Sequence, residues 1–272
     1  MTVNTNTLAE QIYLELYTSK NNTLSLIPLS DRLQSNMSSV LKTQEDRVVE
    51  LNEWEQRWEE NKIGFHQPQV HRMLESKLDK VLAGRKEVRF FFPLCGKAVD
   101  MKWLADMGHS VVGVEISEIA IQQFFVENNL SYSEEPVLGL PGAKIFKNSE
   151  KNISLYNCDL YSFASSIAGQ FGAIWDRGSL VAINPRDREK YASLIISLMA
   201  NDCRYLLSTL MYNPELYKGP PFVVPGEQVY ALFGERYNVE QLLSENVTED
   251  KHRARGIDNL IEQLYLITPK IN

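Results

Sequence analysis

The segment from Val88 to Glu115 constrains the fold of this 272-residue chain more than any other. Residues 88–92 are an apolar run that ends at Pro93, which is typical of a strand buried on both faces of a parallel sheet. Gly96 lies in the turn that follows, where the missing Cβ lets a ligand approach the backbone closely. We expect a helix over 99–107 and a second strand over 110–115, which ends on Glu115.

This strand–turn–helix–strand unit predicts a crevice that binds a nucleoside. The N-terminus of the helix directs unpaired N–H groups at whatever lies above the turn. A carboxylate at the end of the second strand is placed to accept hydrogen bonds from both hydroxyls of a ribose, and Glu115 occupies that position.

The rest of the chain continues the alternation of strands and helices. We expect further strands over 153–158, 171–175, 204–210, 237–243 and 260–268, with amphipathic helices between several of them. Residues 131–151 interrupt the pattern and read as an insertion or a long loop, with 137–138 and 144–146 as candidates for a hairpin. The fold class is therefore α/β, a mostly parallel sheet with helices on both faces.

The N-terminal end differs in composition from this core. Residues 1–45 are rich in Ser, Thr, Asn and Gln, so we expect a polar, poorly ordered extension, followed by one domain over 46–272. That domain opens with an amphipathic helix carrying Trp54 and Trp58. Two interpretations stay open for these tryptophans: ordinary core packing, or an aromatic lid over a ligand.

The net charge, the cysteines and the hydropathy bear on nucleic-acid binding, on the cellular compartment and on membrane association. The formal net charge of -7 argues against a nucleic-acid-binding surface. The three cysteines contain no Cys-x-x-Cys pair, which favours free thiols in a reducing compartment. No apolar run approaches the ~20 residues that span a bilayer, and no secretory signal is evident. We expect a cytoplasmic monomer that binds neither nucleic acid nor a membrane.

Four predicted strand ends carry residues suited to an adenosine-containing cofactor. In an open sheet these ends meet at one crevice. Glu115 suits a ribose, Asp159 an exocyclic amine, and Leu160 the face of a ring. The set of strand-end residues is Leu94, Gly96, Glu115, Asp159, Leu160, Asp176 and Arg177.

The turn after the first strand separates two kinds of cofactor. A dinucleotide favours a Gly-x-Gly-x-x-Gly turn that admits a pyrophosphate, whereas this turn has Leu94 and Val99 where two of those glycines would fall. S-adenosylmethionine has no phosphate, so one glycine at Gly96 suffices for its methionine part. The pattern favours methyl transfer over dinucleotide redox chemistry, which remains an alternative.

Several long blocks closely resemble the thiopurine S-methyltransferase family. They include Phe-Phe-Pro-Leu-Cys-Gly-Lys-Ala-Val at 91–99, Gly-His-Ser-Val-Val-Gly-Val-Glu-Ile-Ser at 108–117, Asn-Leu-Ser-Tyr-Ser-Glu-Glu-Pro at 129–136, Ile-Trp-Asp-Arg-Gly at 174–178 and Ala-Ile-Asn-Pro at 182–185. The likeness runs from about residue 51 to residue 268, so only the N-terminal extension lies outside it.

The resemblance implies a class I methyltransferase fold, which is Rossmann-like, with seven strands and an antiparallel last strand. It implies S-adenosylmethionine as methyl donor and aromatic or heterocyclic thiols as small-molecule acceptors. Carried over to matching positions, the cofactor contacts are Trp54, Trp58, Phe65, Leu94, Gly96, Glu115, Asp159, Leu160 and Arg177. Phe65 and Arg177 are also implied to contact the acceptor.

Two departures from the family pattern bear on the site. The mammalian members of the family have Ser where Asp159 stands. Residues 250–256 also differ, because mammalian members carry Arg at the position of Lys251 and Trp at the position of Arg255. This segment is thought to line the acceptor side, so Lys251 is a candidate acceptor contact and the acceptor preference is open.

Methyl transfer from a sulfonium requires a sulfur nucleophile held in line behind the methyl carbon. Heterocyclic thiols are partly anionic near neutral pH, so we expect no strong protein base and no metal site. Asp176 and Arg177 are the expected catalytic residues: Arg177 as the partner of a thiolate or ring nitrogen, and Asp176 as a residue that orients Arg177 and does not act as a base. The alternative for Arg177 is a purely structural ion pair with Asp176. The alternatives are a class I methyltransferase for a selenium compound, a halide or an amine, and an inactive homologue that only binds the cofactor.

Overall fold

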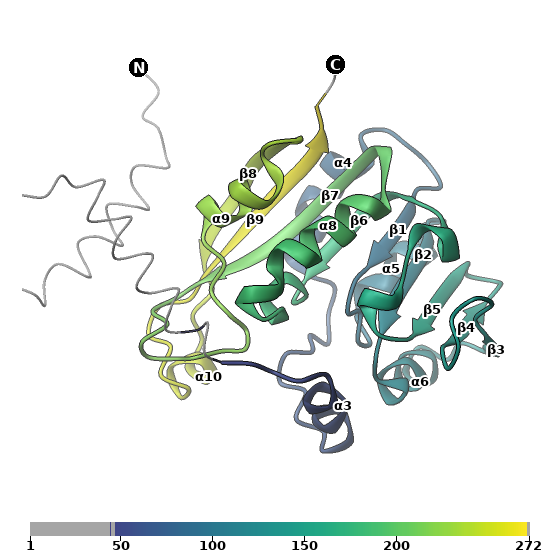
Figure 1. The fold of residues 1–272 in the computed structure, drawn as a ribbon, viewed down its shortest axis with the longest axis horizontal. Coiled ribbons are helices and arrows are strands. Elements are labelled where there is room, and N and C mark those ends of the chain that lie inside the picture. The colour runs from purple at the N-terminus through teal and green to yellow at the C-terminus, as the bar shows by residue number, and fades with distance from the viewer. Residues whose placement is uncertain (1–43, 45–46, 271–272) are drawn as a thin grey trace, which may run out of the picture. The chain divides into compact units, whose positions relative to one another are not determined.

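The computed structural model describes Gln44 and residues 47–270, and these contain a sheet of nine strands (Figure 1). The spatial order is β3-β4-β5-β2-β1-β6-β7-β9-β8. The strands are β1 (Arg89–Phe92), β2 (Ser110–Glu115), β3 (Ser133–Pro136), β4 (Lys144–Asn148), β5 (Ile153–Asn157), β6 (Phe171–Arg177), β7 (Met199–Met211), β8 (Tyr237–Asn246) and β9 (Ile261–Pro269).

The centre of the sheet is parallel and the order of its strands reverses beside β1. From β1 the chain proceeds outward through β2 and β5, and then returns to β6 and β7 on the other side. The last strand, β9, runs antiparallel between β7 and β8, which confirms the expected α/β class and the antiparallel last strand. Parallel strands direct their carboxyl ends to the same edge, so a crevice forms where the order reverses.

The expected count of seven strands is wrong, because the insertion over 131–151 forms a hairpin. β3 pairs antiparallel with β4, and β4 pairs antiparallel with β5. The four residues of β3 are all exposed, so this strand has no buried face and no apolar alternation to mark it in the sequence.

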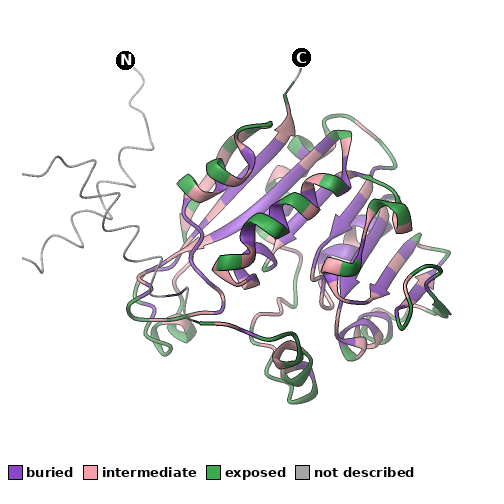
Figure 2. Ribbon diagram, in the orientation of Figure 1, coloured by how far each residue is buried: buried purple, intermediate pink, exposed green. Residues whose placement is uncertain are grey.

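Helices cover both faces of the sheet. One face is covered by α4 (Arg72–Leu82), α5 (Val99–Asp106) and α6 (Glu118–Glu127), and the other by α8 (Arg188–Leu198) and α9 (Gly226–Phe233). Figure 2 shows the strands largely buried between them. The shorter helical segments are α3 (Leu51–Glu59), η1 (Leu160–Ser162), α7 (Ser165–Ala168), η2 (Leu180–Ala182), η3 (Pro185–Asp187) and α10 (Asp250–Arg253). Within the part of the chain that is described, no helix is both long and apolar enough to cross a bilayer.

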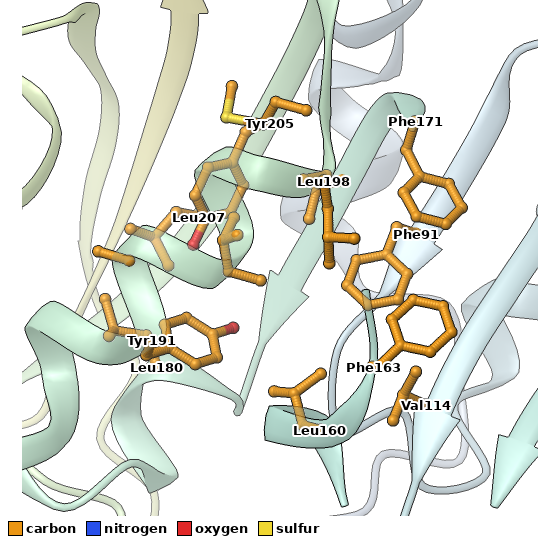
Figure 3. Close-up of a cluster of buried hydrophobic side chains, with 14 of the residues drawn as sticks. Phe91, Val114, Leu160, Phe163, Phe171, Leu180, Tyr191, Leu198, Tyr205 and Leu207 are labelled. Carbon is orange, nitrogen blue, oxygen red and sulfur yellow. The ribbon is translucent and has the colours of Figure 1, made fainter. Parts of the chain in front are cut away.

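Alternation along β1 divides the apolar core into two layers. Phe91 packs with Phe163 and Phe171 on the α8 side of the sheet, as Figure 3 shows, while its neighbours Phe90 and Phe92 belong to the layer beneath α4 and α5. Strand β1 is therefore buried on both faces, as its apolar run predicts. The result is a rigid edge of strand ends that positions the residues of the site.

Candidate functional site

A cavity of about 940 Å³ lies at the carboxyl ends of the parallel strands. Its wall comprises α3 and the loop after it, the ends of β1, β2, β5 and β6, and segments around η2, α10 and β9. Of the residues predicted from the sequence, those that line it are Trp54, Trp58, Phe65, Leu94, Gly96, Glu115, Asp159, Leu160, Arg177 and Lys251. The fold thus brings all but one of the predicted residues together.

Glu115 ends β2 with its carboxylate held by the backbone. Its Oε2 accepts from the N–H of Gly96 at 2.9 Å, and its Oε1 accepts from the N–H of Ser117, also at 2.9 Å. Burial raises the pKa of Glu115, and the backbone donors act in the opposite direction. Each carboxylate oxygen has two lone pairs, so both retain capacity for a further donor such as a hydroxyl.

The turn between β1 and α5 adopts a left-handed backbone at two positions. Gly96 has φ +50° and Leu94 has φ +45°. A Cβ added at Gly96 would lie 3.1 Å from Cζ2 of Trp58, so the glycine accommodates a tryptophan of α3 as well as the bond to Glu115. This close approach places α3 directly against the turn.

Asp159 and Leu160 begin the 3-10 turn η1 after β5. Asp159 is its N-cap, and its Oδ1 accepts from the N–H of Tyr161 at 3.0 Å. Leu160 is 3% exposed and belongs to the core layer of Figure 3. The carboxylate is thereby fixed at the cavity wall beside an apolar surface, an arrangement that suits an aromatic ring with an exocyclic amine.

Three aromatic side chains close the side of the cavity formed by α3. The ring of Phe65 makes edge contacts with Trp54 at 6.0 Å and with Trp58 at 5.7 Å between centroids. Trp58 is buried, whereas most of α3 is exposed (Figure 2). Most of α3 is thus exposed, and its two tryptophans line the cavity.

Arg177 joins the end of β6 to the loop that carries Phe65. Its guanidinium donates to the carbonyl oxygen of Phe65 at 2.7 Å. Burial lowers the pKa of Arg177, and the carboxylates of Glu262 and Asp100 act to raise it. Arg177 therefore presents a cation within a wall that also contains two acids.

The expectation that Asp176 orients Arg177 is wrong, and the alternative ion pair between them is not formed either. Adjacent residues of a strand point to opposite faces, and Asp176 does not line the cavity. Its Oδ2 accepts from the hydroxyls of Tyr191 at 2.6 Å and Tyr205 at 2.7 Å, and its Oδ1 accepts from the N–H of Leu180 at 3.1 Å. Burial raises the pKa of this carboxyl against those donors. Asp176 thus anchors the strand end from behind.

A cluster of polar side chains in the wall was not singled out from the sequence. Glu262 of β9 accepts from the Ser208 hydroxyl at 2.5 Å, and its Oε1 lies 3.3 Å from Nε2 of His71. The backbone N–H of His71 donates to Asp100 at 2.8 Å. His71 occupies the N-cap position of α4, and its side chain is 10% exposed and lines the cavity. A charged residue inside the apolar strand at 260–268 was the one available signal.

The rim near α10 carries two further cations. Lys251 pairs with Glu249 at 2.7 Å and its side chain is half exposed. The guanidinium of Arg255 lies over Gly64, where a Cβ would approach Nη2 to 2.8 Å. Arg255, which follows α10, therefore meets the loop before Phe65 at the rim.

These residues fit S-adenosylmethionine. Glu115 has free acceptor capacity at the end of β2, Asp159 and Leu160 are paired at the end of β5, and Gly96 leaves the turn open. The cavity volume is within the range of sites that hold a cofactor together with a small ligand.

Comparison with known proteins identifies the family. A family model for thiopurine S-methyltransferase matches residues 49–270. A probable thiopurine S-methyltransferase from Danio rerio is 60% identical over 230 residues, covering 85% of this chain and 99% of that protein. A thiopurine S-methyltransferase from Bos taurus is 53% identical over 229 residues, covering 84% of this chain and 94% of that protein.

Solved structures that resemble this chain share the fold at low sequence identity. A 1,6-didemethyltoxoflavin-N1-methyltransferase from Burkholderia thailandensis, solved with S-adenosylhomocysteine, has a TM-score of 0.53 at 13% identity, covering 90% of this chain and 93% of that one. A methyltransferase from Anabaena variabilis, described as SAM-dependent, has a TM-score of 0.52 at 14% identity, covering 82% and 96%. With a family model over most of its length and relatives more than half identical to it, the chain belongs to the thiopurine S-methyltransferase family.

Proposed function

We propose that this protein transfers a methyl group from S-adenosylmethionine to the sulfur of thiopurines and of other aromatic or heterocyclic thiols. The observation that carries the proposal is the cavity at the strand ends, in which Glu115, Asp159 and Arg177 lie together in a chain 60% identical to a probable thiopurine S-methyltransferase. The cofactor supplies an electrophilic methyl group when bound. The residues of the chain hold the reactants and exclude water.

Glu115, Asp159 and Leu160 are the proposed contacts of the adenosine. The Glu115 carboxylate is held rigidly by two backbone donors, so it accepts ribose hydroxyls without reorganising. Asp159 is fixed by its own cap bond and accepts from the adenine amine, while Leu160 packs on the ring. Leu94 and Gly96 lie beside the methionine part, and Trp54 and Trp58 cover it from α3.

Arg177, Phe65 and Lys251 are the proposed contacts of the acceptor. Arg177 places a positive charge near the acceptor sulfur, where it stabilises a thiolate and holds it for in-line attack. Its bond to the carbonyl oxygen of Phe65 fixes the loop whose ring meets the lid. Lys251 lies at the rim, within reach of an anionic substituent on the acceptor.

A competition experiment tests this function. The protein is incubated with labelled S-adenosylmethionine and a mixture of an aromatic thiol, a thiopurine, an amine, a selenol and a halide salt. We expect label in the thioethers. Transfer only to nitrogen, selenium or halide would refute the thiol assignment, and binding of S-adenosylhomocysteine without turnover of any acceptor would identify an inactive homologue.

We also propose that the protein is a cytoplasmic monomer that does not bind nucleic acid. Its three cysteines, Cys95, Cys158 and Cys203, are buried and free, which suits a reducing compartment. Light scattering of the purified protein measures the mass directly, and a mass of twice 31.2 kDa would refute the monomer.

A further inference from the structure

Glu262 and Asp100 are two buried acids of the cavity that the proposed cofactor and acceptor contacts leave unused, and Glu262 is the one considered as a ligand contact. It lies on β9, is 7% exposed and lines the cavity wall. One of its oxygens, Oε1, is occupied by the Ser208 hydroxyl and faces His71. Among the described residues, no hydrogen bond engages its second oxygen, Oε2. A fixed carboxylate with one oxygen that makes no hydrogen bond can accept a hydrogen bond from a bound ligand.

The charges beside Glu262 favour a neutral ring over an anionic ring at this carboxylate. Arg177 is the cation here, and both Glu262 and Asp100 act on its charge. Burial raises the pKa of Glu262, but the His71 contact, the Ser208 hydroxyl and the charge of Arg177 outweigh it and leave the pKa lowered. An ionised Glu262 repels an anionic ring and attracts a neutral ring that carries an N–H.

We propose that Glu262 accepts the ring N–H of a heterocyclic thione and takes its proton as the sulfur is methylated. The inference rests on the proposed function and defines its preferred acceptors as thiones with an N–H beside the carbon–sulfur bond. Ser208 and His71 hold the carboxylate in place, and Arg177 faces the side on which negative charge gathers at sulfur.

The proposed methyl transfer needs no oxidant, reductant or additional base. As the N–H bond breaks, its electron pair restores the aromatic ring and raises the electron density on sulfur. The sulfur forms its bond to the methyl carbon, while the bond between that carbon and the donor sulfonium breaks and leaves a neutral thioether. The ring proton passes to Glu262, which releases it to solvent after the product leaves.

The test compares two acceptors of nearly equal size on Glu262→Gln. Pyridine-2-thione has a ring N–H beside its sulfur, and benzenethiol has none. Glutamine preserves the shape of the side chain but cannot take a proton. We expect kcat/KM for pyridine-2-thione to fall about 10- to 100-fold, the effect of losing a charged hydrogen bond or a general base. The value for benzenethiol should change less than about 3-fold or increase.

Equal losses on both acceptors, or no loss on either, would overturn the proposal. Calorimetry with S-adenosylhomocysteine checks that the variant is folded and binds the cofactor. If Glu262→Gln does not fold, Ser208→Ala is tested instead. This substitution removes the hydroxyl that holds the Glu262 carboxylate and keeps the negative charge of Glu262. Its expected loss is smaller, about 3- to 10-fold, and confined to the thione; an equal loss on both acceptors would overturn the proposal.

The proposed function fails in a different way. A wild-type protein that methylates neither thiol refutes the function and the role of Glu262 together. A wild-type protein that methylates both, alongside a variant with an unchanged ratio of the two, refutes only the role of Glu262.

Discussion

At the scale of single residues, this protein divides its buried acids between binding and support. Glu115 lines the cavity at the end of β2, whereas Asp176 lies behind the end of β6 and accepts from two tyrosines. The sequence places both at strand ends, and it predicts the cavity position of Glu115 but not that Asp176 lies behind the sheet edge. The strand alternation that separates them depends on which residue of β6 faces the cavity, and only the packed structure determines that.

Glu115→Ala should weaken cofactor binding by about 1–3 kcal/mol, the usual cost of leaving buried polar partners unsatisfied. The change removes the acceptor of the Gly96 and Ser117 N–H groups as well as the proposed ribose contact. Calorimetric titration with S-adenosylhomocysteine measures the affinity. Unchanged affinity would show that the carboxylate only stabilises the turn after β1 and does not contact the cofactor.

Asp176→Asn should lower the free energy of unfolding by about 1–3 kcal/mol, because its amide nitrogen must face either the Leu180 N–H or the two tyrosine hydroxyls and cannot accept from them. Urea unfolding measures the loss, and we expect the affinity for S-adenosylhomocysteine to change little. A stable variant with abolished turnover would instead assign a chemical role to Asp176.

At the scale of elements, the site depends on how α3 lies on the turn after β1. Gly96 is the point of contact, with a left-handed backbone, an N–H bonded to Glu115 and Trp58 directly above it. The sequence predicts the glycine, the turn and the amphipathic helix. It does not predict their contact, because residues 60–71 between α3 and α4 contain no periodic pattern that would fix the path of the loop.

Gly96→Ala should therefore impair the lid as well as the turn. A Cβ at φ +50° costs about 1–2 kcal/mol in backbone strain and also displaces the Trp58 ring, which lies 3.1 Å away. We expect a lower melting temperature together with a lower affinity for S-adenosylhomocysteine.

Gly84→Ala is the matched control for this substitution. Gly84 has φ +77° after α4, and a Cβ there meets nothing within 4 Å. The control should show the strain without the loss of affinity. Equal loss of affinity in both variants would remove the role assigned to the contact between Gly96 and Trp58.

At the scale of the whole molecule, the α/β class and the crevice follow from the sequence, while the exact strands of the hairpin at one edge of the sheet do not. Apolar runs in the sequence predict the buried strands, as the three phenylalanines of β1 do. The β3–β4 hairpin adds two strands whose outer member, Ser133–Pro136, is polar and exposed throughout. Glu262 was likewise missed, because a single acid in an apolar strand does not reveal which neighbours reach it from β7 and α4.

The N-terminal boundary of the domain leads to the last prediction. The sequence places it after residue 45, and residues 1–43 lie outside the described part of the chain. Gln44 is already tied to the domain: its side chain donates to the Tyr212 hydroxyl at 2.9 Å and accepts from the N–H of Val223 at 3.0 Å. The domain therefore begins at Gln44 or before it.

Deleting residues 2–43 should leave the melting temperature and the affinity for S-adenosylhomocysteine unchanged. Gln44→Ala in the full-length protein should instead lower the free energy of unfolding by about 1–3 kcal/mol, because the buried Val223 N–H loses its acceptor. Thermal unfolding of the two proteins beside the wild type measures both effects. A deletion as destabilising as Gln44→Ala would contradict the boundary, because residues before Gln44 would then contribute to the stability of the domain.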